Sequence, residues 1–291
     1  MIAVTGANGQ LGRLVLNHLA NLTGAPVRAL VRSPEKAQDL ASDQVTVVKG
    51  DYDDPASLAA ALDGVDRLLL ISGSEVGKRV PQHKAVIDAA KSAGVRFIAY
   101  TSILNTPVSS LILAQEHKAT ELLLAESGLA HALLRNGWYV ENYAGSIAAA
   151  LAHGAVAGAA GNGKISAAGR TDYAEAAARV VSGDDLSTRA YELGGRPAFT
   201  LGDLAAELSR QSGREIPFNN LPEDVYAGIL VQAGLPEGFA KALADADRGT
   251  AAGELETIST DLETLIGHPT RTLSHFVAEA LAQVPTQQIA G

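Results

Sequence analysis

The sequence of 291 residues contains no cysteine. Disulfides, thiol nucleophiles, iron–sulfur clusters and cysteine-ligated zinc are therefore excluded. The absence also suits a reducing compartment. Residues 1–5 form an apolar run that leads directly into a glycine turn, without the basic region and cleavage site of a secretory signal. Together these features predict a cytoplasmic location.

Several active-site motifs are missing as well. The seven histidines are scattered and show no H-E-x-x-H spacing, so we expect no metal site. The chain has no G-x-S-x-G elbow, which argues against an α/β-hydrolase. It also has no G-x-x-x-x-G-K-[ST] loop, which argues against a phosphate-loop NTPase.

The chain lacks a surplus of positive charge. It has 23 basic and 32 acidic residues and a net charge of −9, which argues against a nucleic-acid partner because phosphate binding needs a basic surface. Long leucine-rich runs are absent too. The most apolar stretch, residues 144–161, consists mainly of alanine and glycine, so we expect no membrane segment.

What the sequence does contain is a glycine-rich turn between a predicted strand and a predicted helix. Gly6 permits the tight turn, Gly9 allows phosphates to approach the backbone, and Gly12 allows close packing of helix and strand. The start of the helix offers unpaired N–H groups and a positive dipole end to a diphosphate. The G-x-x-G-x-x-G spacing alone is equally typical of a plain turn, but its flanking elements favour a dinucleotide site. The predicted cradle consists of Gly6, Ala7, Asn8, Gly9, Gln10, Leu11 and Gly12.

Residues that follow the next strands indicate which dinucleotide binds. Arg32 stands where an acidic residue would bind the ribose of NAD, and a basic residue there favours the 2′-phosphate of NADP. A solvated arginine at a strand end is the alternative. Asp51 follows the third strand near the expected adenine edge, with a turn or helix-cap aspartate as its alternative. Ser72, Gly73 and Ser74 follow the fourth strand, whose carboxyl end should face the cofactor.

Apolar strands alternate with helices, which predicts an α/β fold with a doubly wound parallel sheet of the Rossmann type. Residues 1–143 are expected to form the dinucleotide-binding domain, to which residues of about 164–195 return. Residues 144–291 are expected to form a smaller, mixed α/β part that covers the carboxyl ends of the sheet and binds the substrate. Within this part, residues 161–164 predict a hairpin turn and residues 249–253 a flexible stretch.

The chain resembles the NmrA-like, atypical short-chain dehydrogenase/reductases. The glycine turn is common to the wider superfamily. Narrower likenesses are the run Arg135-Asn136-Gly137-Trp138-Tyr139 and the late run Gly267-His268-Pro269. The resemblance extends over nearly the whole chain and is greatest to the quinone reductases of the family.

This resemblance implies NADP(H) as the cofactor, with its nicotinamide side near residues 72–74 and near Asn136, Gly137, Trp138 and Tyr139. It also implies direct hydride transfer to a small, quinone-like acceptor without a flavin. A homodimer is left open.

One departure from the family concerns proton transfer. Short-chain dehydrogenases usually employ a Tyr-x-x-x-Lys pair, but no tyrosine here is followed by lysine four positions later. Reduction of an aliphatic ketone needs a proton donor, whereas a reduced quinone is a delocalised phenolate that can take its proton from water. His117, Lys118 and Tyr139 are the candidate catalytic residues. A polar helix surface is an equal alternative for the first two, and simple aromatic packing at a strand end is the alternative for Tyr139.

The missing pair also suits another class of protein. A redox-sensing regulator of the NmrA type would bind NADP(H) without turnover, and it is the alternative function. Oxidation of NADPH by a quinone separates the two hypotheses.

Overall fold

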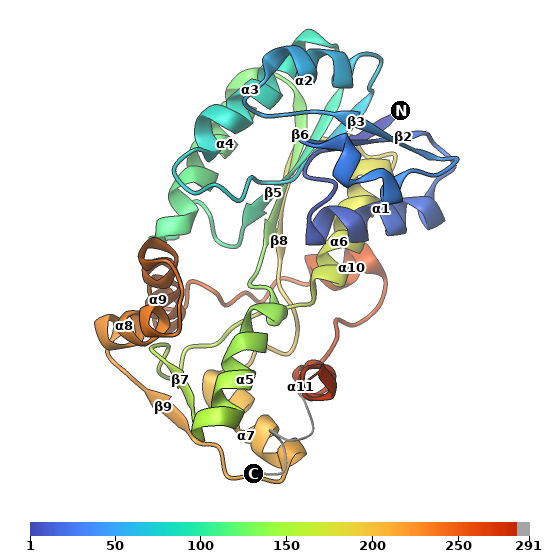
Figure 1. Ribbon diagram of the computed structural model, residues 1–291. Coiled ribbons are helices and arrows are strands. Elements are labelled where there is room, and N and C mark those ends of the chain that lie inside the picture. The colour runs from blue at the N-terminus through green and yellow to red at the C-terminus, as the bar shows by residue number, and fades with distance from the viewer. Residues whose placement is uncertain (284–291) are drawn as a thin grey trace.

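The computed structural model describes residues 1–283 and confirms the α/β fold with a parallel sheet (Figure 1). Residues 284–291, the end of the expected smaller part, lie outside the described residues. The strand order is β3-β2-β1-β4-β5-β6-β8, and every neighbouring pair is parallel. The strands are β1 (Ile2–Val4), β2 (Val27–Val31), β3 (Val45–Lys49), β4 (Arg67–Leu70), β5 (Phe97–Ile103), β6 (Ala130–Asn136) and β8 (Arg189–Leu193).

Helices cover both faces of this sheet. One face packs against α1, α6 and α10, and the other against α2, α3 and α4. Successive residues of β1 point into different cores, Val4 into the first and Ala3 into the second. Burial on both faces explains why the strands are uninterrupted apolar runs. The helices are α1 (Gln10–Leu22), α2 (Pro55–Leu62), α3 (Arg79–Ser92), α4 (Ile112–Ser127), α6 (Arg170–Ser182) and α10 (Asp261–Ile266), and the short turns η1 (Pro34–Lys36) and η2 (Gln38–Leu40) follow β2.

The strand order reverses at the centre of the sheet. From β1 the chain proceeds outward to β2 and β3, and it then returns to the other side of β1 with β4. In open α/β sheets a ligand crevice forms outside the carboxyl ends of the strands at such a switch point. The turn after β1 and the loop after β4 therefore meet at one edge.

A buried ion-pair network connects α4, β6 and β8 at this edge of the sheet. The guanidinium of Arg135 on β6 donates to both carboxylate oxygens of Glu121 on α4, at 3.0 and 2.8 Å, and to Glu192 on β8 at 2.8 Å. Only 13% of the Arg135 side chain and 11% of the Glu121 side chain are exposed. Ser102 of β5 adds a hydrogen bond to Glu121 at 2.7 Å. The network fixes the direction in which the chain leaves β6.

The remaining elements lie below the sheet, and all of them except α8 and α9 contribute to a second core (Figure 1). The short strands β7 and β9 pair in parallel, with Val156 opposite Phe218. A turn does form at the expected residues 161–164, where the N–H of Gly163 donates to the carbonyl of Ala160 at 2.9 Å, but it does not join two antiparallel strands, so the expected hairpin is wrong. A side chain at Gly163 would meet the backbone of Thr250, so close approach to α9 is what this glycine permits. These elements are η3 (Val140–Tyr143), α5 (Ala144–His153), β7 (Val156–Gly158), α7 (Leu201–Ser212), β9 (Phe218–Asn220), α8 (Glu223–Gln232), α9 (Glu237–Ala251) and α11 (Leu273–Gln283).

The flexible stretch expected at residues 249–253 is also wrong. Helix α9 continues through Gly249 and Thr250 to Ala251. A Cβ atom on Gly249 would lie 3.3 Å from Cγ of Leu111, so the helix needs glycine there in order to pack against the residue that precedes α4. Packing, rather than freedom of the backbone, accounts for this glycine.

Helix length bears on the membrane question. A spanning helix needs about 20 mostly apolar residues. The described helix α4 has 16 residues and carries several charges. Within residues 1–283, no helix is both long and apolar enough to cross a membrane.

Candidate functional site

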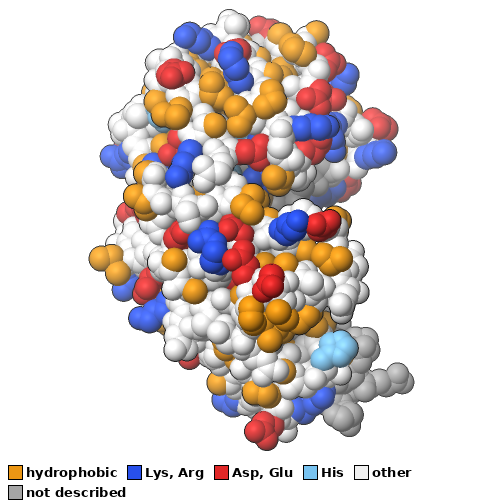
Figure 2. Space-filling model, turned by 90° about the vertical axis from the view of Figure 1, so that its left-hand side faces the viewer, with side chains coloured by type: hydrophobic (Ala, Val, Ile, Leu, Met, Phe, Trp, Pro, Cys, Tyr) orange, Lys and Arg blue, Asp and Glu red, His pale blue; other side chains and the backbone are white. Residues whose placement is uncertain are grey.

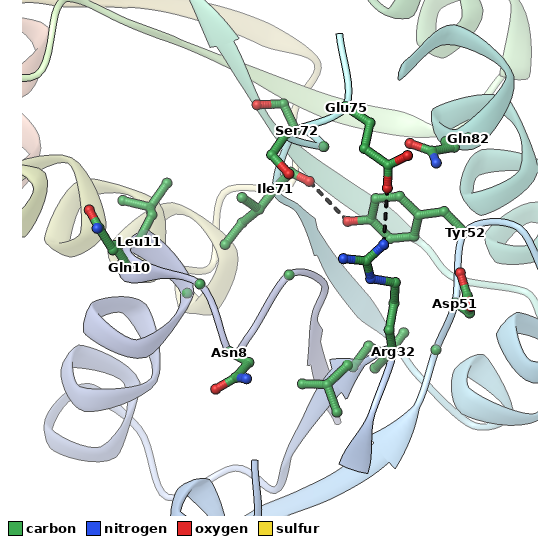
Figure 3. Close-up of a pocket in the computed structure, with 18 of the residues that line it drawn as sticks. Asn8, Gln10, Leu11, Arg32, Asp51, Tyr52, Ile71, Ser72, Glu75 and Gln82 are labelled. Atoms are coloured by element: carbon green, nitrogen blue, oxygen red, sulfur yellow. Dashed lines mark hydrogen bonds and ion pairs between the residues drawn. The ribbon is translucent and has the colours of Figure 1, made fainter. Parts of the chain in front are cut away.

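A cavity of about 700 Å³ opens at the carboxyl edge of the sheet, beside the switch point (Figure 3). Four segments form most of its wall: the turn after β1 and the ends of β2, β3 and β4. Tyr139 and Arg170 close it from the side of β6 and α6. Of the residues predicted to bind the cofactor, the cavity is lined by Gly6, Asn8, Gly9, Gln10, Leu11, Gly12, Arg32, Asp51, Ser72, Gly73, Ser74 and Tyr139.

The glycine turn has the geometry of an anion cradle. Gly6 adopts a positive φ of 58°, and Gly9 is the N-cap of α1 but has no side chain to cap it. The first turn of α1 contains no acidic residue. The first N–H groups of a helix have no partner within the helix, so they are directed at the cavity. A diphosphate fits this cradle, because its oxygens would accept from these groups.

Gly9 and Gly12 have different structural roles. A Cβ atom on Gly12 would overlap the carbonyl of Gly6 and lie 2.7 Å from Cα of Ala7, so this glycine permits helix–strand packing. A Cβ atom on Gly9 would lie 3.2 Å from the carbonyl oxygen of Gly6 and meet little else. The space beside Gly9 is thus the cavity itself.

The predicted 2′-phosphate end is positively charged but partly neutralised. Arg32, Ser33 and Lys36 line the cavity there. Arg32 donates to Glu75 at 3.0 Å, and Lys78 pairs with the same carboxylate at 3.1 Å (Figure 3). Arg32 is therefore not a free cation, and an anionic ligand at this end would compete with Glu75.

Asp51 closes a turn at the edge of the cavity. It lines the cavity, and its Oδ1 accepts from the N–H of Asp53 at 3.1 Å, which closes a turn. The helix cap is instead Asp54, which accepts from the N–H of Ser57. The neighbouring Tyr52, which sequence reasoning did not select, lines the cavity too.

The loop after β4 is held by side chains rather than by sheet pairing. Thr5 accepts from the N–H of Ile71 at 3.0 Å, and Thr101 accepts from the N–H of Ser72 at 2.9 Å. Tyr52 donates to the carbonyl of Ile71 at 3.0 Å. These three side chains come from separate segments of the sheet edge.

Two residues of α3 also bind the backbone of this loop. His83 Nε2 accepts from the N–H of Gly73 at 2.9 Å, and Arg79 Nε donates to the carbonyl of Gly73 at 2.6 Å. Arg79 also lines the cavity. Because Nε2 of His83 is an acceptor, its proton lies on Nδ1, which is 2.9 Å from the hydroxyl of Thr120. Burial lowers the pKa of His83 to about 4, so the ring is neutral.

The end of the cavity beyond β6 contains Tyr139. Its hydroxyl accepts from Asn136 Nδ2 at 3.4 Å, and the guanidinium of Arg170 lies 4.8 Å from the centre of its ring. Burial raises the pKa of Tyr139, so its hydroxyl keeps its proton. Oδ1 of Asn136 is buried and has no protein partner.

Other residues predicted for the site lie behind the cavity wall. Ala7 is buried under the turn, and Asn136 is buried next to Tyr139. A side chain at Gly137 would lie 2.7 Å from the carbonyl of Ser166, so this residue is packed on all sides. Trp138 packs between two apolar clusters. These four residues support the wall rather than form it.

Two of the catalytic candidates also lie away from the cavity lining. His117 is 6% exposed and is hydrogen-bonded through Nδ1 to the hydroxyl of Tyr100 at 2.8 Å. Burial lowers its pKa to about 3. Lys118 donates to the carbonyl of Ser109 at 2.7 Å. Of the three candidates, Tyr139 alone is among the residues that line the cavity.

Sequence reasoning missed Tyr52, Arg79, His83 and Arg170. Tyr52 is adjacent to the predicted Asp51, so position along the chain was a usable signal. The other three lie on helices, and no motif links them to the glycine turn. Within residues 1–283, no group of histidine and acidic side chains could hold a metal ion.

The NAD(P)H-binding family matches residues 6–184. This chain belongs to that family. It is 54% identical to quinone oxidoreductase 2 of Escherichia coli over 279 residues, which cover 96% of this chain and 98% of the relative.

Solved structures agree with this assignment. An E. coli NADPH-dependent quinone oxidoreductase in complex with NADPH has a TM-score of 0.94 and 53% identity, over 97% of this chain and all of that chain. The triphenylmethane reductase of Citrobacter sp. in complex with NADP(H) has a TM-score of 0.89 and 36% identity, over 96% and 99% of the two chains.

Substitution of Gly9 tests the cradle. We expect Gly9→Val to abolish binding of NADPH and to leave the fold intact, because the new side chain would enter the path of the diphosphate. Isothermal titration of the folded variant measures this. Gly12→Val is the matched control, and it should unfold the turn because its side chain meets backbone. Unchanged affinity in Gly9→Val would show that the turn is only structural.

The neutral histidines predict a loss of stability in acid. The pKa is about 4 for folded His83 and about 3 for folded His117, so between these values and pH 6.5 the unfolded chain binds protons that the folded chain does not. The contribution of His83 is complete above about pH 6.5 and is lost as the pH falls to 4. We expect about 3 kcal/mol of this loss from His83.

Urea titrations from pH 7 to pH 4 measure the loss. His83→Gln keeps an acceptor for Gly73 but does not titrate, so its free energy of unfolding should depend less on pH. A pH dependence equal to that of the wild type would contradict the assignment.

Proposed function

We propose that this protein is an NADPH-dependent oxidoreductase that transfers a hydride directly to a quinone-like acceptor without a flavin. The observation that carries the proposal is a complete dinucleotide cavity on a chain that is 54% identical, over nearly its full length, to a quinone oxidoreductase. In this proposal the N–H groups at the start of α1 bind the diphosphate. Arg32, Ser33 and Lys36 bind the 2′-phosphate, and Asp51 lies on the adenosine side.

The acceptor side of the proposed site is opposite the 2′-phosphate end. Residues 72–74 and Tyr139 would contact the nicotinamide, with Asn136, Gly137 and Trp138 supporting them from behind. Residues 1–143, with about 164–195, would form the cofactor domain. Residues 144–291 would form the part that covers the acceptor.

Bound NADPH supplies a hydride, and the protein has to orient the acceptor and exclude water. Tyr139 presents a neutral hydroxyl held by Asn136, and Arg170 fixes its ring. No Tyr-x-x-x-Lys pair is required, because the reduced quinone is stabilised by delocalisation and can take its proton from solvent. His117 and Lys118 would influence the site only indirectly.

The regulator remains the rival hypothesis, and high identity to a protein named as an oxidoreductase favours the enzyme. The proposal includes a cytoplasmic location and no nucleic-acid or membrane partner. Acidic and basic side chains are intermixed on the face seen in Figure 2, as expected for a protein of net charge −9 without a nucleic-acid partner.

Turnover is the direct test. The purified protein should be colourless, and oxidation of NADPH, followed at 340 nm, should depend only on added benzoquinone or naphthoquinone. His117→Ala and Lys118→Ala should change the rate modestly, whereas loss of an obligatory acid would lower kcat by about 10²–10⁴-fold. A bound flavin or a collapse of kcat in either variant would disprove the mechanism. Tight NADPH binding without turnover by any quinone would favour the regulator.

Cofactor preference tests Arg32. Arg32→Ala should weaken NADPH binding by about tenfold and leave NADH binding unchanged, because only NADPH carries the phosphate that accepts a charge-assisted hydrogen bond. Glu75→Gln should strengthen NADPH binding, because it releases Arg32 from its ion pair. Arg96→Ala is the control, since Arg96 is an exposed arginine that pairs with Asp66, and neither residue lines the cavity. Equal losses for both cofactors would show that Arg32 has no part in the preference.

A further inference from the structure

Hydride transfer to a quinone creates a charge that the site has to accommodate. The acceptor gains two electrons and one proton, so it leaves the transfer step as a hydroquinone monoanion with its negative charge on oxygen. A second proton from water then gives the hydroquinone, while NADPH has become NADP⁺. This inference rests on the proposed function. A fixed cation at the acceptor end would stabilise the charge as it develops.

Four basic side chains line the cavity, and they differ in their partners. Arg32 pairs with Glu75, and Arg170 lies 3.7 Å from a carboxylate oxygen of Glu141. Lys36 lies with Arg32 at the 2′-phosphate end. Arg79 has a single side-chain hydrogen bond, to the carbonyl of Gly73, and within residues 1–283 it forms no ion pair with a carboxylate. Its two terminal amino groups are therefore available to a ligand.

The position of Arg79 is fixed from two sides. Its Nε is bound to the carbonyl of Gly73 at 2.6 Å, and its backbone N–H donates to Oε1 of Glu116 at 3.1 Å. Glu116 Oε1 also accepts from the N–H of Gly77 at 3.0 Å, so it caps the start of α3. A guanidinium held in this way needs little reorganisation when charge develops beside it.

The positive charge of Arg79 affects the pKa of side chains on β5, on α4 and in the segment after β6. Burial raises the pKa of Tyr100 and of Tyr139, and the nearby positive charge of Arg79 opposes both shifts. Burial lowers the pKa of His117, and Arg79 lowers it further. Tyr139 is the residue that lines the cavity beyond β6. Arg79 thus lines the cavity beside Gly73, where the proposed function places the nicotinamide.

We propose that Arg79 is a catalytic residue whose free guanidinium nitrogens bind the acceptor oxygen on which negative charge develops. It would replace the stabilising role of the missing Tyr-x-x-x-Lys pair without donating a proton.

A phenol that changes colour on ionisation tests the proposal without turnover. 4-Nitrophenol would be titrated spectroscopically at 400 nm in the presence of protein saturated with NADP⁺. In the wild type we expect the apparent pKa of the bound phenol to fall by about one unit, because an opposite charge nearby favours the phenolate. Arg79→Met should abolish the shift and Arg79→Lys should keep part of it. Lys91→Met, an exposed change in the last turn of α3, should keep all of it.

Three outcomes would overturn the proposal. One is a pKa shift of the bound phenol in Arg79→Met that equals the shift in the wild type. Another is that the wild type does not bind the phenol or does not shift its pKa. The third is a rise of more than tenfold in the dissociation constant for NADP⁺ in Arg79→Met, which would assign Arg79 to the cofactor phosphates. If Arg79→Met does not fold, as judged by circular dichroism, Arg79→Lys alone decides. A pKa shift of the bound phenol equal to that in the wild type, together with an unchanged kcat, would contradict the proposal.

Kinetics separate this proposal from the proposed function. Arg79→Met should lower kcat for benzoquinone by about 10²-fold, the usual effect of removing one donor to an oxyanion, with the affinity for NADPH unchanged. Failure of the wild type to reduce any quinone would refute the proposed function by itself. The shift of bound nitrophenol would still be measurable in that case.

Discussion

The site depends on how the backbone is satisfied where β4 ends. Beyond Leu70 the chain leaves the ladder, and its N–H and C=O groups need new partners because unpaired buried groups are costly. Side chains from several elements provide them: Thr5, Tyr52, Thr101, Arg79 and His83 all bind the backbone of residues 71–73. One wall of the cavity is thereby fixed to β1, to the end of β3, to β5 and to α3 at once.

The second constraint is the buried network around Arg135. Breaking such a network by removing its cation would leave the carboxylates of Glu121 and Glu192 largely desolvated, which is strongly unfavourable. The network therefore defines the course of the chain from β6 to Tyr139. Asn136 and Gly137 lie between these two points; Asn136 is buried, and a side chain at position 137 would meet the backbone of Ser166. The run from Arg135 to Tyr139 thus supports one lining residue, with the others behind it.

Charge is distributed unequally along the cavity. At the end near β2 Arg32 is balanced by Glu75, which is itself shared with Lys78. Tyr139 beyond β6 is neutral, and Arg79, which is bound to Gly73 in the loop after β4, has no carboxylate partner in the described residues. The 2′-phosphate of NADPH at the end near β2, and a separate acceptor that becomes a phenolate near Tyr139, would match this arrangement.

The sequence by itself determined the parallel α/β fold, the glycine cradle and the residues that follow β2, β3 and β4. These features depend on short-range patterns: apolar runs buried on both faces, glycines at fixed spacing, and the rule that strand ends meet at one edge. The tertiary structure alone decided the roles of Arg79, His83 and Glu75, because their partners are set by packing between distant elements. It also decided that Gly163 and Gly249 serve close packing against α9 and Leu111, since a glycine in a sequence does not reveal what approaches it.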